Sequence, residues 1–413
     1  MTGTRGDGFP YALLGTWGLT RLVLLLFVFR VFLFPGPDVT SDVSVIYQGW
    51  YEVLRTGTFP LDDVTWQYPP AAALAILSPG LLPFLDYTSA FFVLAFLADV
   101  LVFALLQYAG LRPGKSLRGA WVWVAGVPLL GPTVYARYDV MVTAVAVAAL
   151  LAGARHPRLM GALAGFGAMV KVWPVLLLVG AAKGSAKRAW ASAAVTIGGL
   201  ALLFAASMPG AFSFLAFQRN RGTEVESLGS LVFHVARHLG WDGEVLLNYG
   251  SVEFLGRYVD VVSGAALFLT AVAFGWVLLW RLCAKRFLAH TLAEAAFVAV
   301  LMFTATSRVI SPQYMVWLVG LAAVCLCFRG TRMTVPVGLV LAAAFVTVLE
   351  FPVWFSHVVA SDALGITLLF VRNGLLVAAA LTAAVQLWRG TVSRPAPTVP
   401  SQAARTRESL ASS

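Results

Sequence analysis

Long apolar runs recur along this 413-residue chain, and they constrain its fold more than any other feature. Hydrophobic residues make up 60% of the sequence and charged residues only 12%, about half of the charged share that is typical of a soluble domain. Runs of roughly 20 apolar residues cross a hydrocarbon core of ~30 Å, where helices satisfy their own backbone hydrogen bonds. The sequence therefore predicts an all-α polytopic membrane bundle with about ten to twelve spans.

The net charge of +10 is distributed in a way that favours a membrane topology over nucleic-acid binding. Basic residues gather in short gaps between the apolar runs, at Lys183, Lys187, Arg188, Arg281, Lys285, Arg286, Arg329 and Arg332. Acidic residues gather in two longer loops, at Asp38, Asp42, Glu52, Asp62 and Asp63 and at Glu224, Glu226, Asp242, Glu244 and Glu253. By the positive-inside rule the short basic loops are cytoplasmic and the two acidic loops face outward. We expect a multi-pass protein of the cell membrane with both termini in the cytoplasm.

The apolar run 11–34 is too long for the core of a signal peptide and is expected to be an uncleaved first span. One integral domain is predicted over residues 1–388, followed by a disordered cytoplasmic tail, 389–413, rich in Pro, Ser, Ala and Arg. The three cysteines have no metal-binding spacing, and His234 and His238 have no evident third ligand. We therefore expect no metal and no cofactor.

Most later spans are clearly delimited, whereas the topology between residues 69 and 190 has two solutions. The later spans are expected at 189–207, 259–281, 290–306, 313–328, 334–350 and 363–388. In one solution 69–86 and 88–110 both cross the membrane, which leaves the basic segment 111–118 outside. In the other, 69–86 re-enters without crossing, so 111–118 is cytoplasmic and Lys171 lies at an external turn between two short helices. The second solution keeps every basic loop inside.

The segment between Ser41 and Pro70 is polar, aromatic and acidic, and it follows the first span directly. Asp42 stands near its start, and Tyr68-Pro69-Pro70 stands where the next apolar run begins. An acidic loop between two membrane segments is a suitable place for a carboxylate that acts on a lipid-borne substrate. The alternative is that Asp42 is an ordinary solvated carboxylate.

This loop, from Asp42 to Trp66-Gln67-Tyr68-Pro69-Pro70, resembles the first external loop of glycosyltransferase family 87. Members are integral-membrane mannosyltransferases of the GT-C class that use polyprenyl-phosphate mannose. Shorter similarities occur at residues 168–174, 218–227, 308–314 and 371–373. The resemblance implies a GT-C bundle in which Asp42 is the catalytic base. Some members carry histidines after a Ser-Pro motif where this chain has Gln313 and Tyr314, so a histidine-assisted role is not carried over.

Glycosyl transfer from a lipid phosphate needs a base for the acceptor hydroxyl and cations for the leaving phosphate. Charged residues inside a membrane are costly and usually functional. The predicted substrate-binding residues are Tyr68, Lys171, Arg221, Glu226, Arg308, Gln313 and Arg372. Alternatively, Lys171 only extends to the membrane interface, Arg308 and Arg372 form structural ion pairs, and Tyr68 only positions the loop. Arg137 and Asp139 are expected to pair with each other.

The sequence thus predicts a membrane mannosyltransferase that uses polyprenyl-phosphate mannose and a lipid-linked or cell-envelope glycan acceptor at the outer membrane face. The first alternative is a lipid-sugar transporter or flippase, against which stands the lack of an internal repeat. The second is a non-catalytic membrane scaffold, for which scattered intramembrane Lys and Arg would be a poor choice.

Overall fold

The computed structural model describes residues 8–219 and 221–392, and helices dominate it. The α-helices are α1 (Gly8–Val28), α2 (Gln48–Leu54), α3 (Ala72–Leu77), α4 (Tyr87–Gly110), α5 (Arg118–Gly126), α6 (Asp139–Gly153), α7 (Pro157–Val170), α8 (Lys183–Ser207), α9 (Phe214–Arg219), α10 (Leu231–Arg237), α11 (Val259–Cys283), α12 (Thr291–Thr306), α13 (Tyr314–Leu326), α14 (Thr334–Val348), α15 (Phe355–Ala360) and α16 (Ala363–Thr391). Shorter 3₁₀ and π segments are η1 (Asp42–Tyr47), η2 (Ser78–Leu81), η3 (Pro128–Val134), η4 (Trp173–Gly180) and η5 (Leu349–Val353). The disordered tail was expected from residue 389, but residues 389–391 belong to α16, and the remainder from residue 393 lies outside the described residues.

Six of the described helices are long and apolar enough to cross a membrane: α1, α4, α8, α11, α14 with its η5 extension, and α16. The shorter apolar helices α6, α12 and α13 rise only about 20–24 Å at 1.5 Å per residue, which is why they fall below that length. They occupy the interior, where every residue from Met315 to Leu326 of α13 is buried. The predicted all-α polytopic membrane architecture is confirmed, with fewer full-length helices than the expected ten to twelve spans.

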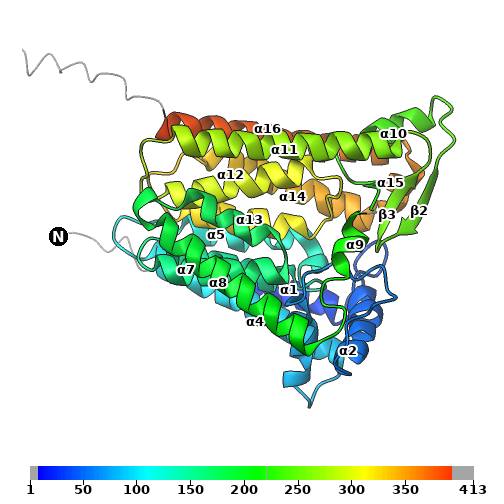
Figure 1. Ribbon diagram of the computed structural model, residues 1–413, viewed down its shortest axis with the longest axis horizontal. Helices are drawn as coiled ribbons and strands as arrows, with labels where there is room; N and C mark the ends of the chain where they lie inside the picture. The colour runs from blue at the N-terminus through cyan, green and yellow to red at the C-terminus, as the bar shows by residue number, and fades with distance from the viewer. Residues whose placement is uncertain (1–7, 220, 393–413) are drawn as a thin grey trace, which may run out of the picture.

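The peripheral helices α8 and α11 bury little of their surface inside the protein, whereas the central α13 is almost completely buried. In Figure 1, α11 and α16 run along one edge of the bundle, and α7, α8 and α4 form a slanted layer at the other.

Two of the long helices begin with a side-chain cap: Asp86 accepts a hydrogen bond from the Ser89 N–H at α4, and Asp362 accepts one from the Gly365 N–H at α16. Such caps satisfy backbone donors that the first helical turn leaves unpaired.

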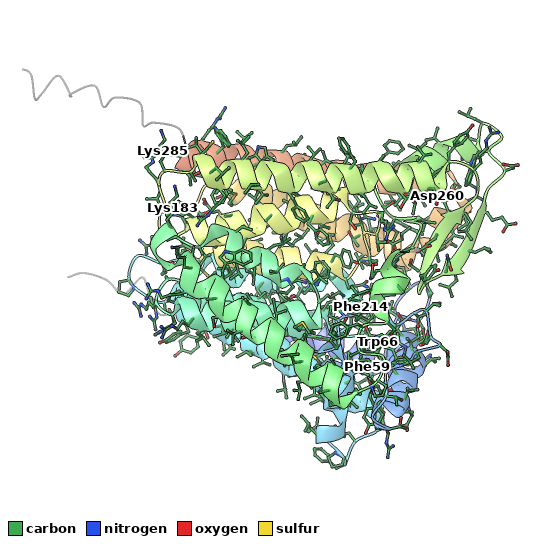
Figure 2. All side chains as sticks on the ribbon, in the orientation of Figure 1. Phe59, Trp66, Lys183, Phe214, Asp260 and Lys285 are labelled. Atoms are coloured by element: carbon green, nitrogen blue, oxygen red, sulfur yellow. The ribbon has the colours of Figure 1, made fainter. Side chains whose placement is uncertain are left out.

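Residues 69–86 are not a full crossing. They contain only one short apolar helical unit, Ala72–Leu81, which would span about 15 Å. Arg112, Lys115 and Arg155 line one cavity together with Ser185 and Phe287, so these basic segments meet at one end of the bundle. Figure 2 shows Lys183 and Lys285 at that end and Asp260 at the other. This arrangement favours the re-entrant solution over two crossings.

The second acidic loop contains a small antiparallel sheet that the sequence reading did not anticipate. Its strands are β1 (Thr223–Glu224), β2 (Glu244–Asn248) and β3 (Ser251–Leu255), in the order β1-β3-β2. The β2–β3 turn has positive φ at both Tyr249 and Gly250, as a two-residue hairpin turn of the right twist requires. The loop also has its own apolar cluster, in which Phe233 and Phe254 pack near Val358 and Leu369. It is therefore a folded cap on one end of the bundle.

Candidate active site

One cavity of about 620 Å³ lies between the two acidic loops and the helix ends beneath them. Its volume is in the range of small-molecule sites, ~300–1,000 Å³. The cavity brings together seven of the eight site residues predicted from the sequence: Asp42, Tyr68, Lys171, Arg221, Glu226, Arg308 and Gln313. Arg372 is the exception.

Asp42 is held at the cavity wall by Arg137. Asp42 opens the π-helical turn η1, and its Oδ2 lies 2.5 Å from Nη2 of Arg137. Arg137 is buried and also donates hydrogen bonds to the carbonyl oxygens of Ala136 and Val39. The Asp42 side chain keeps 35% of its surface exposed, and its Oδ1 accepts no hydrogen bond from the described part of the chain. Asp42 thus lines the cavity with one carboxylate oxygen anchored and the other not engaged by the described residues.

Lys171 reaches the cavity because helix α7 stops at Val170. Lys171 is extended (φ −157°, ψ 118°), and Pro174 follows, which disfavours a continuous helix since its ring removes a backbone donor. Gly167 permits this break, since a Cβ at that position would lie 2.9 Å from Cβ of Pro174. The sequence prediction of a turn between two short helices at Lys171 matches this geometry.

The Lys171 ammonium is surrounded by one carboxylate and several aromatic rings. Its Nζ lies 2.6 Å from Oδ1 of the buried Asp139, which also accepts a hydrogen bond from Trp317 Nε1 at 2.7 Å. Four ring centres lie 5.0–5.6 Å from Nζ, those of Tyr68, Tyr138, Tyr314 and Trp317. Rings at that distance attract a cation. Lys171 is thus a buried, positioned cation, and the alternative in which it only extends to the interface is not what the structure shows.

The expected pairing of Arg137 with Asp139 is wrong. Arg137 binds Asp42 and Asp139 binds Lys171, so each partner comes from a distant part of the chain. Tyr138 stands between the two residues and packs against Tyr47 and Tyr68. Two neighbouring charges on one turn thereby hold two different cavity residues.

Among the four basic residues that line this cavity, Arg308 is the one that has no ion pair with a described carboxylate. It donates a short hydrogen bond to the Gln218 carbonyl and a longer one, 3.4 Å, to Ser263 Oγ. Among the described residues, no carboxylate lies within ion-pair distance of it. The adjoining Ser-Pro segment is fixed by Glu224, which accepts hydrogen bonds from Ile310 N at 2.5 Å and from Ser311 Oγ at 3.0 Å. The backbone next to Arg308 is therefore held in place, and its guanidinium can bind an anion.

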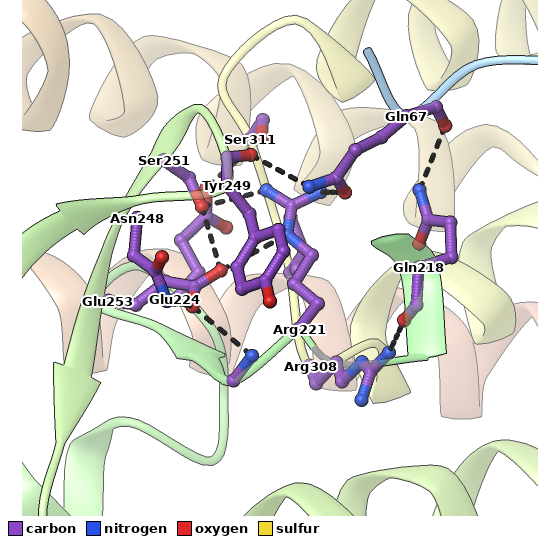
Figure 3. Close-up of polar contacts among 12 residues, drawn as sticks. Gln67, Gln218, Arg221, Glu224, Asn248, Tyr249, Ser251, Glu253, Arg308 and Ser311 are labelled. Atoms are coloured by element: carbon purple, nitrogen blue, oxygen red, sulfur yellow. Dashed lines mark hydrogen bonds and ion pairs between the residues drawn. The ribbon is translucent and has the colours of Figure 1, made fainter. Parts of the chain in front are cut away.

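Arg221 connects the two acidic loops, as Figure 3 shows. Its guanidinium donates to Gln67 Oε1 (3.1 Å), Ser251 Oγ (2.7 Å) and Glu253 Oε1 (3.2 Å). Gln67 is bound further by the second loop, since its Nε2 donates to the Tyr249 carbonyl at 3.0 Å. Arg221 lines the cavity, but its hydrogen bonds are largely used within the protein.

Arg372 does not line the cavity. It is completely buried in α16, where it forms a bidentate ion pair with Glu350 and donates to the Glu226 carbonyl. Asn373 donates to the carbonyls of Glu226 and Ser227. The structural-ion-pair alternative therefore describes Arg372, whose role is to fix the second loop onto the last helix.

Glu226 and Tyr68 line the cavity as buried polar groups. Burial, followed by repulsion from Glu224 and Glu350, raises the pKa of Glu226 well above its usual value. Burial raises the pKa of Tyr68 to about 12, so its hydroxyl stays neutral. Gln313 lies at the cavity just before α13. Glu226, Tyr68 and Gln313 thus supply hydrogen-bonding side chains to the cavity wall.

Histidine and carboxylate groupings suited to a metal ion do not occur in the described ranges 8–219 and 221–392. His234 and His238 both contact Ser361, through its hydroxyl and its carbonyl respectively. Burial lowers the pKa of His234 to about 4. The pair ties α10 to the end of α15.

Sequence reasoning missed Arg137 and Asp139 as parts of this site. The signal was present in Tyr-Ala-Arg-Tyr-Asp, but their closeness in sequence suggested a pair between them. Their true partners, Asp42 and Lys171, become neighbours only when the loop, the α6 start and the α7 break converge.

The fold and this cavity define a polytopic membrane protein with an acidic and cationic pocket at one end of its helical bundle. The family model of glycosyltransferase family 87 matches residues 66–312, more than half of the chain. The chain belongs to glycosyltransferase family 87 and is a membrane glycosyltransferase. No curated protein and no solved structure matches it significantly. Asp42, Gln313 and Arg372 lie outside the matched interval, whereas Tyr68, Lys171 and Arg308 lie within it.

Proposed function

We propose that this enzyme transfers mannose from polyprenyl-phosphate mannose to a hydroxyl of a lipid-linked or cell-envelope glycan at the outer face of the cell membrane. The observation that carries the proposal is the convergence of a half-exposed carboxylate, Asp42, with Lys171 and Arg308 in one cavity beneath the external loops. A base and a set of phosphate-binding cations are the two requirements of this reaction. Family membership supports glycosyl transfer over the flippase alternative.

In the proposed reaction Asp42 is the general base. Its Oδ1 takes the proton of the acceptor hydroxyl while Arg137 holds Oδ2 in place. The acceptor oxygen forms a bond to the anomeric carbon, and the bond from that carbon to the phosphate oxygen breaks. Polyprenyl phosphate leaves with the bonding electrons, so a β-linked donor gives an α-linked product by single displacement.

The leaving phosphate gains negative charge, and Arg308 with Lys171 is proposed to stabilise it. Charge-assisted hydrogen bonds to a phosphate are stronger than neutral ones, and the aromatic surroundings of Lys171 exclude water that would weaken them. Tyr68, Gln313 and Glu226 then serve as sugar- or acceptor-binding groups. The raised pKa of Glu226 favours its protonated form, which donates a hydrogen bond as well as accepting one.

The test is incubation of membranes with labelled polyprenyl-phosphate mannose and identification of the labelled glycan. Asp42→Asn keeps the shape of the side chain and removes its basicity, so transfer is expected to fall by at least about a hundredfold. Asp62→Asn is the matched control, because Asp62 is an exposed carboxylate of the same loop that does not line the cavity. Its activity is expected to equal that of wild type.

Activity of Asp42→Asn within a few-fold of wild type would remove Asp42 from the chemistry. Movement of labelled donor across the membrane without formation of a new glycosidic bond would instead support the flippase alternative. A labelled product from another polyprenyl-phosphate sugar, but not from mannose, would change the donor while keeping the reaction class.

A further inference from the structure

A second cavity of about 670 Å³ lies at the opposite, basic end of the bundle. It is formed where the ends of α4, α6, α7, η4, α8 and α12 converge with the loops between them. Its walls are mainly apolar, and its charged lining side chains are all basic: Arg112, Lys115 and Arg155. No carboxylate lines it within the described part of the chain.

The cations of this cavity lack neutralising partners. The Arg155 side chain is exposed and makes no hydrogen bond or ion pair with the described residues. Lys115 Nζ lies only over the ring of Phe328, 3.0 Å from its centre, and Arg112 contacts the Tyr108 hydroxyl. Desolvation lowers the pKa of Lys115, and repulsion from Arg112 and Arg155 adds to this effect. Like charges that crowd together without a carboxylate are stabilised by an anion from outside.

The apolar part of the same cavity reaches the surface of the bundle. Leu159 and Leu288 line it and are each 49% exposed, and Tyr108 is 63% exposed. Tyr108 lies in the last turn of α4, one of the helices long enough to cross a membrane, while Leu159 lies in the first turn of α7 and Leu288 in the loop before α12. A ligand that fits has a negative charge for the basic loops and an apolar part for the leucines.

We propose that this cavity binds the headgroup and upper acyl chains of an anionic phospholipid from the membrane leaflet at the basic end of the bundle. Basic pockets between membrane helices on the cytoplasmic side suit such headgroups. The proposal concerns a site separate from the candidate active site, so it does not depend on the proposed transfer reaction. A bound lipid would hold the α6–α7 and α8–α12 ends together, because the lining residues come from all four helices.

The test is equilibrium binding of a fluorescent phosphatidylglycerol to the purified full chain in a neutral detergent, with phosphatidylcholine and inorganic phosphate as competitors. Lys115→Gln combined with Arg155→Gln is expected to weaken binding by about tenfold or more, since each basic residue near the headgroup contributes. Arg158→Gln combined with Lys187→Gln removes the same net charge from exposed positions outside the cavity. This control is expected to bind within about twofold of wild type.

Excess unlabelled phosphatidylglycerol should displace the probe, and phosphatidylcholine should not. Equal binding by wild type and the Lys115/Arg155 variant would overturn the proposal, as would an equal loss in the control variant. Displacement by millimolar inorganic phosphate would assign the cavity to a soluble phosphate instead of a lipid. If the double variant does not fold, Arg155→Gln alone decides, because that exposed side chain makes no hydrogen bond or ion pair with the described residues whose loss would destabilise the protein. An unchanged affinity for this single variant would equally refute the site.

Discussion

Lys171 is the residue for which the structure most changes the design of an experiment. Replacing Lys171 by Met removes the cation proposed to hold the donor phosphate, but it also leaves Asp139 without its partner. Asp139 is 1% exposed, and breaking a buried ion pair by removing one partner costs about 3–5 kcal/mol. Total stabilities are only ~5–15 kcal/mol, so the single variant is expected to be poorly folded. Its inactivity would say nothing about the donor.

The double variant Lys171→Met/Asp139→Asn separates the two effects. The neutral amide at position 139 still accepts the hydrogen bond from Trp317, and no unpaired charge remains. We expect most of the lost thermal stability to return, measured as the unfolding midpoint of the detergent-purified enzyme. Donor affinity should remain about thirty- to several-thousandfold below wild type, because the phosphate has lost a buried countercharge. Asp139→Asn alone breaks the same buried pair and is also expected to lose stability, but it keeps the Lys171 cation and should therefore retain donor binding wherever it is folded.

Two results would refute this reasoning. A double variant that is folded and binds donor as wild type does would show that Lys171 only neutralises Asp139. A double variant as unstable as Lys171→Met would show that the burial of an unpaired Asp139 charge is not the cause of the instability.

Three further predictions follow from the other features of the site. Arg308→Gln should weaken donor binding by about ten- to a hundredfold, whereas Arg257→Gln, an exposed cation outside the cavity, should leave donor binding unchanged. Burial raises the pKa of Glu226 above 4.5 in the folded state, so the folded state binds a proton more tightly than the unfolded state, and stability should fall as pH rises above 4.5. Glu226→Gln should make the unfolding midpoint less dependent on pH over this range. A pH profile of the variant that runs parallel to that of wild type would contradict this prediction. In a variant that lacks Cys283, the native cysteine that is not buried, an impermeant thiol reagent added to whole cells should label Leu247→Cys but not Gly184→Cys. Reversed labelling would overturn the proposed orientation.

The sequence predicted the helical membrane class because apolar runs and charge placement act locally and need no knowledge of contacts. In one of its two topologies, charge placement also predicted a turn at Lys171, where the structure shows that α7 ends before Pro174. It could not assign Arg372, because a buried arginine in a late helix is equally suited to a substrate anion or to Glu350. The structure decides by bringing Glu350 and Arg372 together across two helices. Pairings of this kind depend on tertiary packing, and a single sequence carries no direct record of them.

The hairpin between β2 and β3 was missed for a different reason. Its turn residues, Tyr249 and Gly250, include only one that favours positive φ, so the local signal for a two-residue turn was weak. The strands are also short, and their pattern lies in a loop whose acidic composition suggested solvent exposure. Hydrogen bonds from Gln67 and Arg221 to this hairpin hold the turn that its local sequence specifies only weakly.

Those contacts have a consequence for anyone who wishes to re-engineer acceptor preference. Gln67 belongs to the first acidic loop, yet its side chain and carbonyl bind Arg221, Tyr249 and Gln218 of the second. A chimera that grafts only one loop from a relative would leave several buried polar groups without partners, at about 1–3 kcal/mol each. The exchangeable module is therefore the pair of loops together, and libraries that vary them should recombine both as one cassette.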